Sequence, residues 1–350
     1  MSAPGADSGR GSADSDGRSD DEPRTSAPGK VLLAGEYAVL DGAEAVIAAV
    51  NRRVVATVLA PGDRVLRRSM RSPFLRAVRT AVSRHAGPDS VAAERAGRMY
   101  ADSGALRDHS GPKLGLGSSA AVTVAACACA LARDQPPPTP ALIHTLAHAA
   151  HGDAQLRRGA RGSGADVAAS VYGGVVAVQV RADPREAVAV RPLAPTLRLH
   201  QVHLVFVWTG TSASTPALVS RVQAWRGVDP RAYERTIAAV GDAAAALIAS
   251  LAPGASATDI VAAVAAGGEA AARLGRDAGV AIETDAHLAI AALARARGGA
   301  AKPTGAGGGD IALVAFSSAD AAEGFRTDAR AQGFAIIDMA VDPHGVRIGS

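Results

Sequence analysis

The segment at 112–123, PKLGLGSSAAVT, has the composition of a phosphate-binding turn. Its glycines free backbone amides to point at a ligand, and the positive end of the helix dipole that follows favours an anion. Serine hydroxyls at such a position can cap the helix or bind a phosphate oxygen or a metal. A glycine turn that merely starts a helix looks similar, so the segment alone does not decide. The residues able to contact phosphate here are Lys113, Gly115, Leu116, Gly117, Ser118 and Ser119.

Lysine is scarce in this chain, and its placement is informative. Of 37 basic residues only three are lysine, namely Lys30, Lys113 and Lys302. Each lies in a glycine-containing segment: SAPGKVLLAGEYAVLDG, PKLGLGSS and KPTGAGGGD. A chain that uses arginine on its solvated surface keeps lysine mainly where a compact ammonium group is needed. The three segments are therefore candidates for binding an anionic ligand.

In this order, the three segments resemble those of the GHMP kinase superfamily. The resemblance runs from about Ala27 to Gly349 and includes the Gly-Leu-Gly-Ser-Ser loop and a glycine-rich loop close to the C-terminus. Within the superfamily the chain is most similar to the phosphomevalonate kinases. Mevalonate kinases usually have Gly-Glu-His in the first motif, where this chain has Gly35-Glu36-Tyr37. Asp310 and the stretches at 161–174 and 207–215 also resemble the phosphomevalonate branch.

The resemblance implies an α+β fold made of two-layer α/β sandwiches, with an N-terminal domain like ribosomal protein S5 domain 2 and a ferredoxin-like C-terminal domain. It implies ATP and Mg²⁺ as cofactors. Lys30 and Asp166 are the implied catalytic residues, residues 113–119 the ATP loop, and Ser118 and Ser119 the metal ligands. Substrate contacts are implied for Lys30, Tyr37, Ser163, Gly164, Ala306, Gly307, Gly308 and Asp310.

Asp166 is ambiguous when read without the resemblance. It follows Gly162-Ser163-Gly164, whose glycines allow close approach of a substrate, but an aspartate also caps helices well. Many family members carry a magnesium-binding glutamate upstream of this aspartate. Here the neighbourhood offers Asp153 and Gln155, so the residue that completes the metal sphere stays open.

The implied reaction is the ATP-dependent phosphorylation of (R)-5-phosphomevalonate to 5-diphosphomevalonate. A phosphate acceptor has a second pKa of about 6 and is largely deprotonated at pH 7, so Asp166 is expected to orient Lys30 instead of acting as a strong base. Lys30, Lys113 and Arg161 are candidates for offsetting repulsion between the two anions. The alternatives are a mevalonate kinase or another small-molecule kinase of the superfamily, and a catalytically silent relative that binds a ligand.

Composition limits the other classes of function. The formal charge is +4 with a pI near 9.4, but the arginines lack the aromatic interleaving of a nucleic-acid surface, so small anionic substrates are the expected partners. The chain has no apolar run of the length that a membrane span needs. Cys127 and Cys129 read as core residues of a reducing cytoplasm. The sequence leaves open whether the protein is a monomer or a homodimer.

Hydrophobic patterning predicts a tail at 1–24 without stable structure, an N-terminal domain at 25–190 and a C-terminal domain at 191–350. Strands are expected at 31–40, 45–50 and 52–60, with breaks at Asp41-Gly42 and at Asn51. Further strands are expected at 175–180, 203–210, 311–316, 334–341 and 344–349. Helices are expected at 73–85, 119–133, 140–151, 231–251, 256–273, 285–297 and 319–332.

Three histidines, His144, His148 and His151, share one face of the helix expected at 140–151. Their spacing raises the possibility of zinc, but no carboxylate or cysteine accompanies them in a metalloprotease-like pattern. Packed or solvated histidines are the favoured interpretation.

Overall fold

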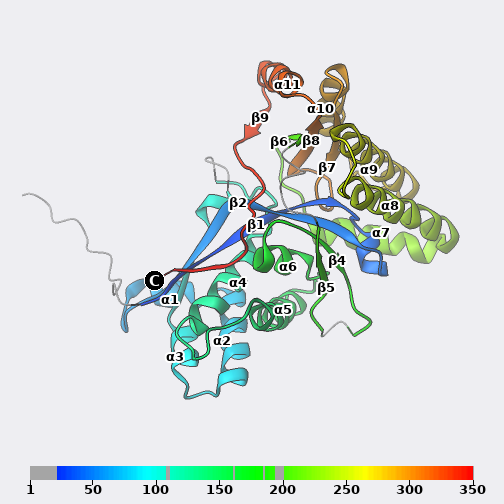
Figure 1. The fold of residues 1–350 in the computed structure, drawn as a ribbon. Helices are drawn as coiled ribbons and strands as arrows, with labels where there is room; N and C mark the ends of the chain where they lie inside the picture. Colours follow the sequence, from blue (N-terminus) through cyan, green and yellow to red (C-terminus); the bar gives the residue numbers. More distant parts are fainter. Residues whose placement is uncertain (1–21, 108–110, 161, 184–185, 194–200, 350) are drawn as a thin grey trace, which may run out of the picture.

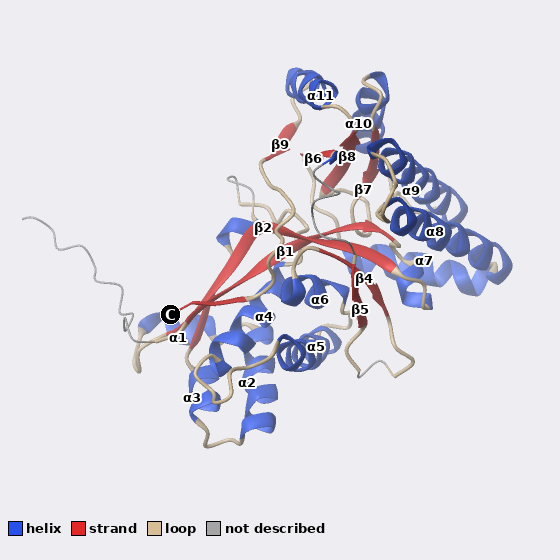
Figure 2. Ribbon diagram, viewed as in Figure 1, coloured by secondary structure: helices blue, strands red, loops and turns tan. Residues whose placement is uncertain are grey.

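Two antiparallel sheets organise the chain (Figures 1 and 2). The computed structural model describes residues 22–107, 111–160, 162–183, 186–193 and 201–349. The first sheet has the order β10-β1-β2-β4-β5, and β3 also pairs with β2. Its strands are β1 Arg24–Ala34, β2 Ala45–Val58, β3 Met99–Asp102, β4 Val175–Gln179, β5 Ala189–Pro192 and β10 Arg347–Gly349. The second has the order β7-β8-β6-β9, with β6 His203–Trp208, β7 Ala300–Pro303, β8 Ile311–Phe316 and β9 Ala335–Ile337.

Each sheet carries its own helices, as expected of an α+β fold (Figure 2). Those beside the first sheet are α1 Arg64–Ser69, α2 Pro73–Ala86, α3 Val91–Gly97, α4 Ser118–Leu131, α5 Pro140–Leu156 and α6 Ala165–Tyr172. Those that pack on the second sheet are α9 Ala257–Ala278, α10 Asp285–Ala296 and α11 Ala319–Ala331. Helix α8 Pro230–Ser250 packs on α9 and also contacts β1 and β2, and α7 Thr215–Val228 packs on α8 and α9. Two short 3₁₀ helices, η1 Ala38–Asp41 and η2 Gly104–Leu106, complete the described elements. None of the described helices combines the length and the apolar character that crossing a bilayer requires.

Helix α4 is the centre of the first half. It has no charged residue, and nearly every side chain from Ala120 to Leu131 is fully buried against β1, β2, α2 and α5. Small alanines let these elements approach α4 closely on all sides, as expected of a helix that is apolar all round. Cys127 and Cys129 lie in this core as free thiols, and burial raises the pKa of each to about 12.

The N-terminal strands differ from the sequence expectation in two places. Residues 38–41 form η1 instead of continuing a strand, because Gly35 and Tyr37 have φ angles of 88° and 64° and turn the chain. Asn51 does not end a strand. It lies in the continuous strand β2, at a register shift between Pro28 and Gly29 of β1 that marks a β-bulge.

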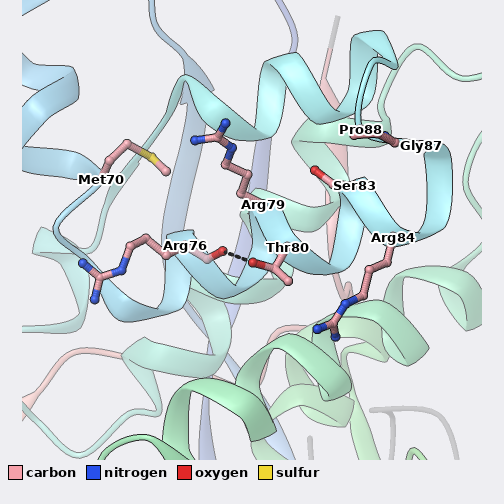
Figure 3. A pocket seen from close by; sticks show the side chains of 8 residues that line it. All are labelled: Met70, Arg76, Arg79, Thr80, Ser83, Arg84, Gly87 and Pro88. Atoms are coloured by element: carbon pink, nitrogen blue, oxygen red, sulfur yellow. Dashed lines mark hydrogen bonds between the residues drawn. The ribbon is translucent and has the colours of Figure 1, made fainter.

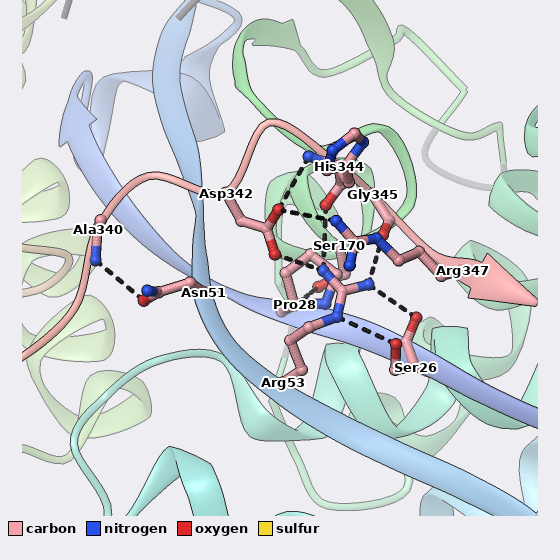
Figure 4. Close-up of polar contacts among 10 residues, drawn as sticks. All are labelled: Ser26, Pro28, Asn51, Arg53, Ser170, Ala340, Asp342, His344, Gly345 and Arg347. Carbon is pink, nitrogen blue, oxygen red and sulfur yellow. Dashed lines mark hydrogen bonds and ion pairs between the residues drawn. The ribbon is translucent and has the colours of Figure 1, made fainter. Parts of the chain in front are cut away.

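The C-terminal segment returns to the first sheet (Figure 4). Arg53 of β2 contacts Asp342 at 2.5 Å, and its guanidinium also donates to Ser26 and to the Gly345 carbonyl. Asp342 is buried, so this pair lies inside the protein. The division at about residue 190 stays a prediction. The sheets do separate near this point, but β10 crosses back to pair with β1.

The N-terminal tail expected at 1–24 lies mostly outside the described residues, which begin at Glu22. In the described part, Glu22 pairs with Arg95 and Arg98, and β1 begins at Arg24. The expectation of a tail without stable structure stays a prediction.

Candidate active site

Lys30 and Asp166, which are far apart in the sequence, form an ion pair in the first half of the molecule. Lys30 lies on β1 and Asp166 in the first turn of α6, and their Nζ and Oδ1 atoms are 3.4 Å apart. The lysine side chain is only 12% exposed, but the carboxylate is 37% exposed and therefore accessible to a ligand. Ser170 of α6 donates to the carbonyl of Pro28 at 2.8 Å, which ties the helix to the strand beside this pair. Asp166 is not a helix cap, because α6 has Gly164 as its N-cap.

The loop before α4 packs directly on this pair. The backbone amide of Lys30 donates to the carbonyl of Leu116 at 3.0 Å. Gly117 has a φ of 69°, and a methyl group there would lie 2.9 Å from Cε of Lys30 and 3.3 Å from Oδ2 of Asp166. Only glycine meets both conditions, the positive φ and the lack of space. The phosphate loop and the catalytic pair predicted from sequence are therefore one site.

Three α-helices of the described chain begin at an N-cap residue whose side chain accepts no hydrogen bond, and all three start at loops of this site. They are α4, α6 and α7, which follow residues 113–117, 162–164 and 209–214. In one of them, α6, the amide of Ala165 instead donates to Oγ of Ser163 at 3.3 Å. The other described α-helices begin at a Ser, Thr or Asp whose side chain accepts from the first turn, as Thr139 does for α5. Uncapped first-turn amides and the helix dipole together favour bound anions.

Asp310 brings the third glycine segment to the same place. Its carboxylate accepts from the amide of Ala213 at 3.2 Å, and a methyl group on Gly115 would lie 2.6 Å from its Oδ2 atom. Burial raises the pKa of Asp310, against the opposing effects of the Ala213 amide and the Lys30 charge. Ser212 also donates to the carbonyl of Lys113 at 3.2 Å. Residues 209–213 are thus part of the site, although sequence reasoning singled out this stretch only through its resemblance.

The other two lysines have different positions from Lys30. Lys113 is exposed at the edge of the loop. Lys302 is buried, and its ammonium pairs with Glu36 and donates to the carbonyl of Pro303 at 2.8 Å. Lys302 therefore joins the first motif to the second sheet, and its ammonium group is paired with Glu36 instead of Asp166. Arg161 lies outside the described residues.

Tyr37 contacts the third glycine-rich segment. Its hydroxyl donates to the carbonyl of Ala306 at 2.7 Å, and the side chain is buried. Burial, with the neighbouring Glu36, raises its pKa. The third loop is held on its other side by the amide of Gly308, which donates to the carbonyl of Ile282 at 2.7 Å. Tyr37 thus reaches the predicted substrate loop through Ala306.

The three histidines of α5 do not form a metal centre. No group of three or more His, Cys, Asp or Glu side chains that could hold a metal occurs among the described residues. His144 contacts the Tyr172 hydroxyl at 3.4 Å, and His148 lies against Gly164. His151 contacts Ser119, with 3.1 Å between Nε2 and Oγ. His144 and His151 are buried, and their contacts are those of packed side chains; the favoured interpretation, packed or solvated histidines, stays a prediction.

The two candidates for the missing metal ligand lie in different surroundings. Asp153 is turned toward Arg84, 3.8 Å away. The amide nitrogen of Gln155 lies 3.5 Å from Nε2 of His151, beside Ser119. Gln155 is therefore the one of the two that adjoins the phosphate loop.

A cavity of about 790 Å³ opens elsewhere, along α2 (Figure 3). Arg76, Arg79 and Arg84 line it together with Met70 and Pro88. It shares no residue with the site described above.

Comparison with known proteins shows which family the chain belongs to. Residues 79–174, which include α4 and Asp166, match the family model of the GHMP kinases N terminal domain. The phosphomevalonate kinase of Streptomyces sp. (strain CL190) is 33% identical over 82% of this chain and 88% of its own length. The chain belongs to the GHMP kinase family.

Solved structures share the fold of this GHMP kinase over nearly its whole length. The Lin0012 protein of Listeria innocua has a TM-score of 0.76 at 23% identity, covering 94% of this chain and 99% of its own. Streptococcus pneumoniae phosphomevalonate kinase, in complex with phosphomevalonate and AMPPNP, has a TM-score of 0.72 at 19% identity, covering 91% and 99%. L. major mevalonate kinase, in complex with R-mevalonate, has a TM-score of 0.68 at 22% identity, covering 92% and 96%. The expected α+β GHMP kinase fold is confirmed.

Proposed function

We propose that this protein transfers the γ-phosphoryl group of ATP to (R)-5-phosphomevalonate, giving 5-diphosphomevalonate and ADP. The observation that carries the proposal is the Lys30–Asp166 pair packed against Gly117, at the uncapped start of α4. The curated phosphomevalonate kinase relative, which this chain matches over most of its length, supports the choice of acceptor.

In this proposal the 113–119 loop binds the phosphates of ATP through backbone amides and the first turn of α4. The acceptor phosphate oxygen attacks the γ-phosphorus, the bond from that phosphorus to the β–γ bridging oxygen breaks, and ADP leaves with the electron pair. The acceptor oxygen is largely deprotonated at pH 7, so no side chain has to remove a proton. Lys30 stabilises the negative charge on the transferred group, and Asp166 holds the ammonium group in place.

Mg²⁺ fits the donor set next to the loop. Magnesium is usually bound through one or two carboxylates together with substrate phosphates and water, so it does not need a cluster of protein ligands. Ser118 and Ser119 would hold it with the phosphates, near the exposed carboxylate of Asp166. When bound, the ion neutralises charge on the phosphates.

Acceptor contacts are proposed for two loops, one in each half of the chain. Ser163 and Gly164 precede α6, and residues 306–308, with Asp310, close the site from the second sheet. Tyr37 contributes by holding the Ala306 carbonyl. The free buried thiols suit a reducing compartment, and we place the activity in the cytoplasm.

The test is ADP release with phosphomevalonate, mevalonate and diphosphomevalonate as separate acceptors, each with wild type and with Lys30→Met. We expect turnover with phosphomevalonate alone and its loss in the variant. Turnover with mevalonate would move the protein to the mevalonate kinases. Binding of ATP without turnover of any acceptor would identify a silent relative.

A further inference from the structure

His151 is a buried polar side chain that the proposed reaction does not yet use. It lies on α5, which packs against α2, α4 and α6. Only 5% of the residue is exposed, and its ring is stacked on Phe74 of α2 with centroids 5.4 Å apart. This stacking fixes the plane of the imidazole. Its Nε2 atom is thereby held 3.1 Å from Oγ of Ser119, the second residue of α4.

The contact matters because of what a serine hydroxyl must do as a metal ligand. A hydroxyl has one proton and two lone pairs. If a lone pair is to face a cation, the proton must point away from it, toward an acceptor. The only side-chain partner of the Ser119 hydroxyl among the described residues is His151. A neutral imidazole nitrogen can accept that proton.

We infer that His151 is a positioning residue for the metal–nucleotide complex: its Nε2 atom accepts the Ser119 proton and so turns the Ser119 lone pairs toward the divalent cation. The inference rests on the proposed function, because it needs a nucleotide-bound metal beside Ser119. It also separates His151 from the other histidines of α5. His144, about two turns earlier in α5, contacts Tyr172 at the end of α6 instead.

The expected loss of metal affinity can be taken from other proteins in which a group outside the metal's own ligands orients one of those ligands. Loss of such a group typically weakens metal binding by about 10- to 100-fold. Binding of the nucleotide without metal depends on the loop amides and lysines and is unaffected by the direction of the Ser119 proton. The signature of the role is therefore a loss confined to the metal complex.

The experiment is calorimetric binding of AMPPNP, once with Mg²⁺ and once with EDTA, at one fixed pH. For His151→Leu we expect affinity for the magnesium complex to fall by about tenfold or more, with metal-free affinity within about twofold of wild type. His151→Gln carries an amide oxygen near the Nε2 position and is expected to restore most of the loss. His144→Leu removes an equally buried histidine from the same helix and is expected to change neither affinity.

Three results would overturn the inference. Equal losses with and without metal would mean that His151 only supports the loop, or that Ser119 donates to phosphate. Failure of His151→Gln to recover metal affinity would exclude the acceptor role, and so would unchanged affinity in His151→Leu. If His151→Leu does not fold, His151→Asn replaces it, because the shorter amide cannot reach Ser119. Wild type that binds AMPPNP in neither condition would overturn the proposed function itself, which distinguishes the two failures.

Discussion

The close packing of Gly117 against Lys30 and Asp166 gives the sharpest prediction. Gly117→Ala adds a methyl group 2.9 Å from Cε of Lys30, whereas ordinary contacts begin at 3.4 Å. The lysine side chain must therefore shift by at least about half an ångström. The shift disturbs the ion pair with Asp166, in which Nζ and Oδ1 are 3.4 Å apart. The positive φ costs a further 1–2 kcal/mol or so of stability. Misplacement of a reacting group by about 1 Å can cost on the order of 100-fold in rate.

The matched control is Gly279→Ala. Gly279 ends α9 with a φ of 62°, close to the 69° of Gly117, but a methyl group there meets nothing within 4 Å. Both variants are expected to lose about 1–2 kcal/mol in denaturant unfolding, because both force alanine into the left-handed region. Only Gly117→Ala is expected to lower kcat for ADP release, by about 100-fold. Equal kcat in the two variants would refute the idea that the loop positions Lys30.

Three further predictions concern single side chains. Asp166→Asn is expected to lower kcat by less than about 100-fold, the lower end of a general base contribution, and a loss near 10⁴-fold would show that this carboxylate removes a proton. Lys302→Met leaves Glu36 buried without its partner and should cost about 3–5 kcal/mol in denaturant unfolding, most of which returns in the Glu36→Gln/Lys302→Met double variant; additive losses would contradict the coupling. Burial and the Lys302 charge lower the pKa of His287 to about 4, so its contribution to stability is present above the unfolded-state pKa near 6.5 and is lost as the pH falls toward 4. His287→Gln keeps the capping box with Thr284. Between pH 7 and pH 5 its free energy of unfolding should fall by about 2 kcal/mol less than that of the wild type, and parallel curves of unfolding free energy against pH would exclude this role.

Much of the fold was predictable from the sequence, because the signals are local. The apolar run that forms α4, the proline at the start of α5 and the capping serine of α9 act within a few residues, and these helices occur where they were expected. Helix α7 was missed because its apolar pattern is weak: Val222 is its one fully buried residue, although Ser214 and Pro216 stand at its start as helix-start signals. Asn51 was misread as a break because the partners that continue the strand lie far away. Its amide and side chain bond to Ala340.

For the site, the sequence by itself determined the local chemistry. The glycines of the phosphate loop, the serines that follow and the glycines before Asp166 are short-range requirements for backbone conformations that other residues avoid, and these motifs proved to be neighbours in space. Only the tertiary structure decided which charged and polar groups face one another. Three lysines looked alike in their glycine-rich segments, but folding pairs Lys30 with Asp166 and buries Lys302 on Glu36, 266 residues away. The physical reason is that a buried charge or hydroxyl takes its role from its partner, and the partner is chosen by the packing of elements that are distant in the chain.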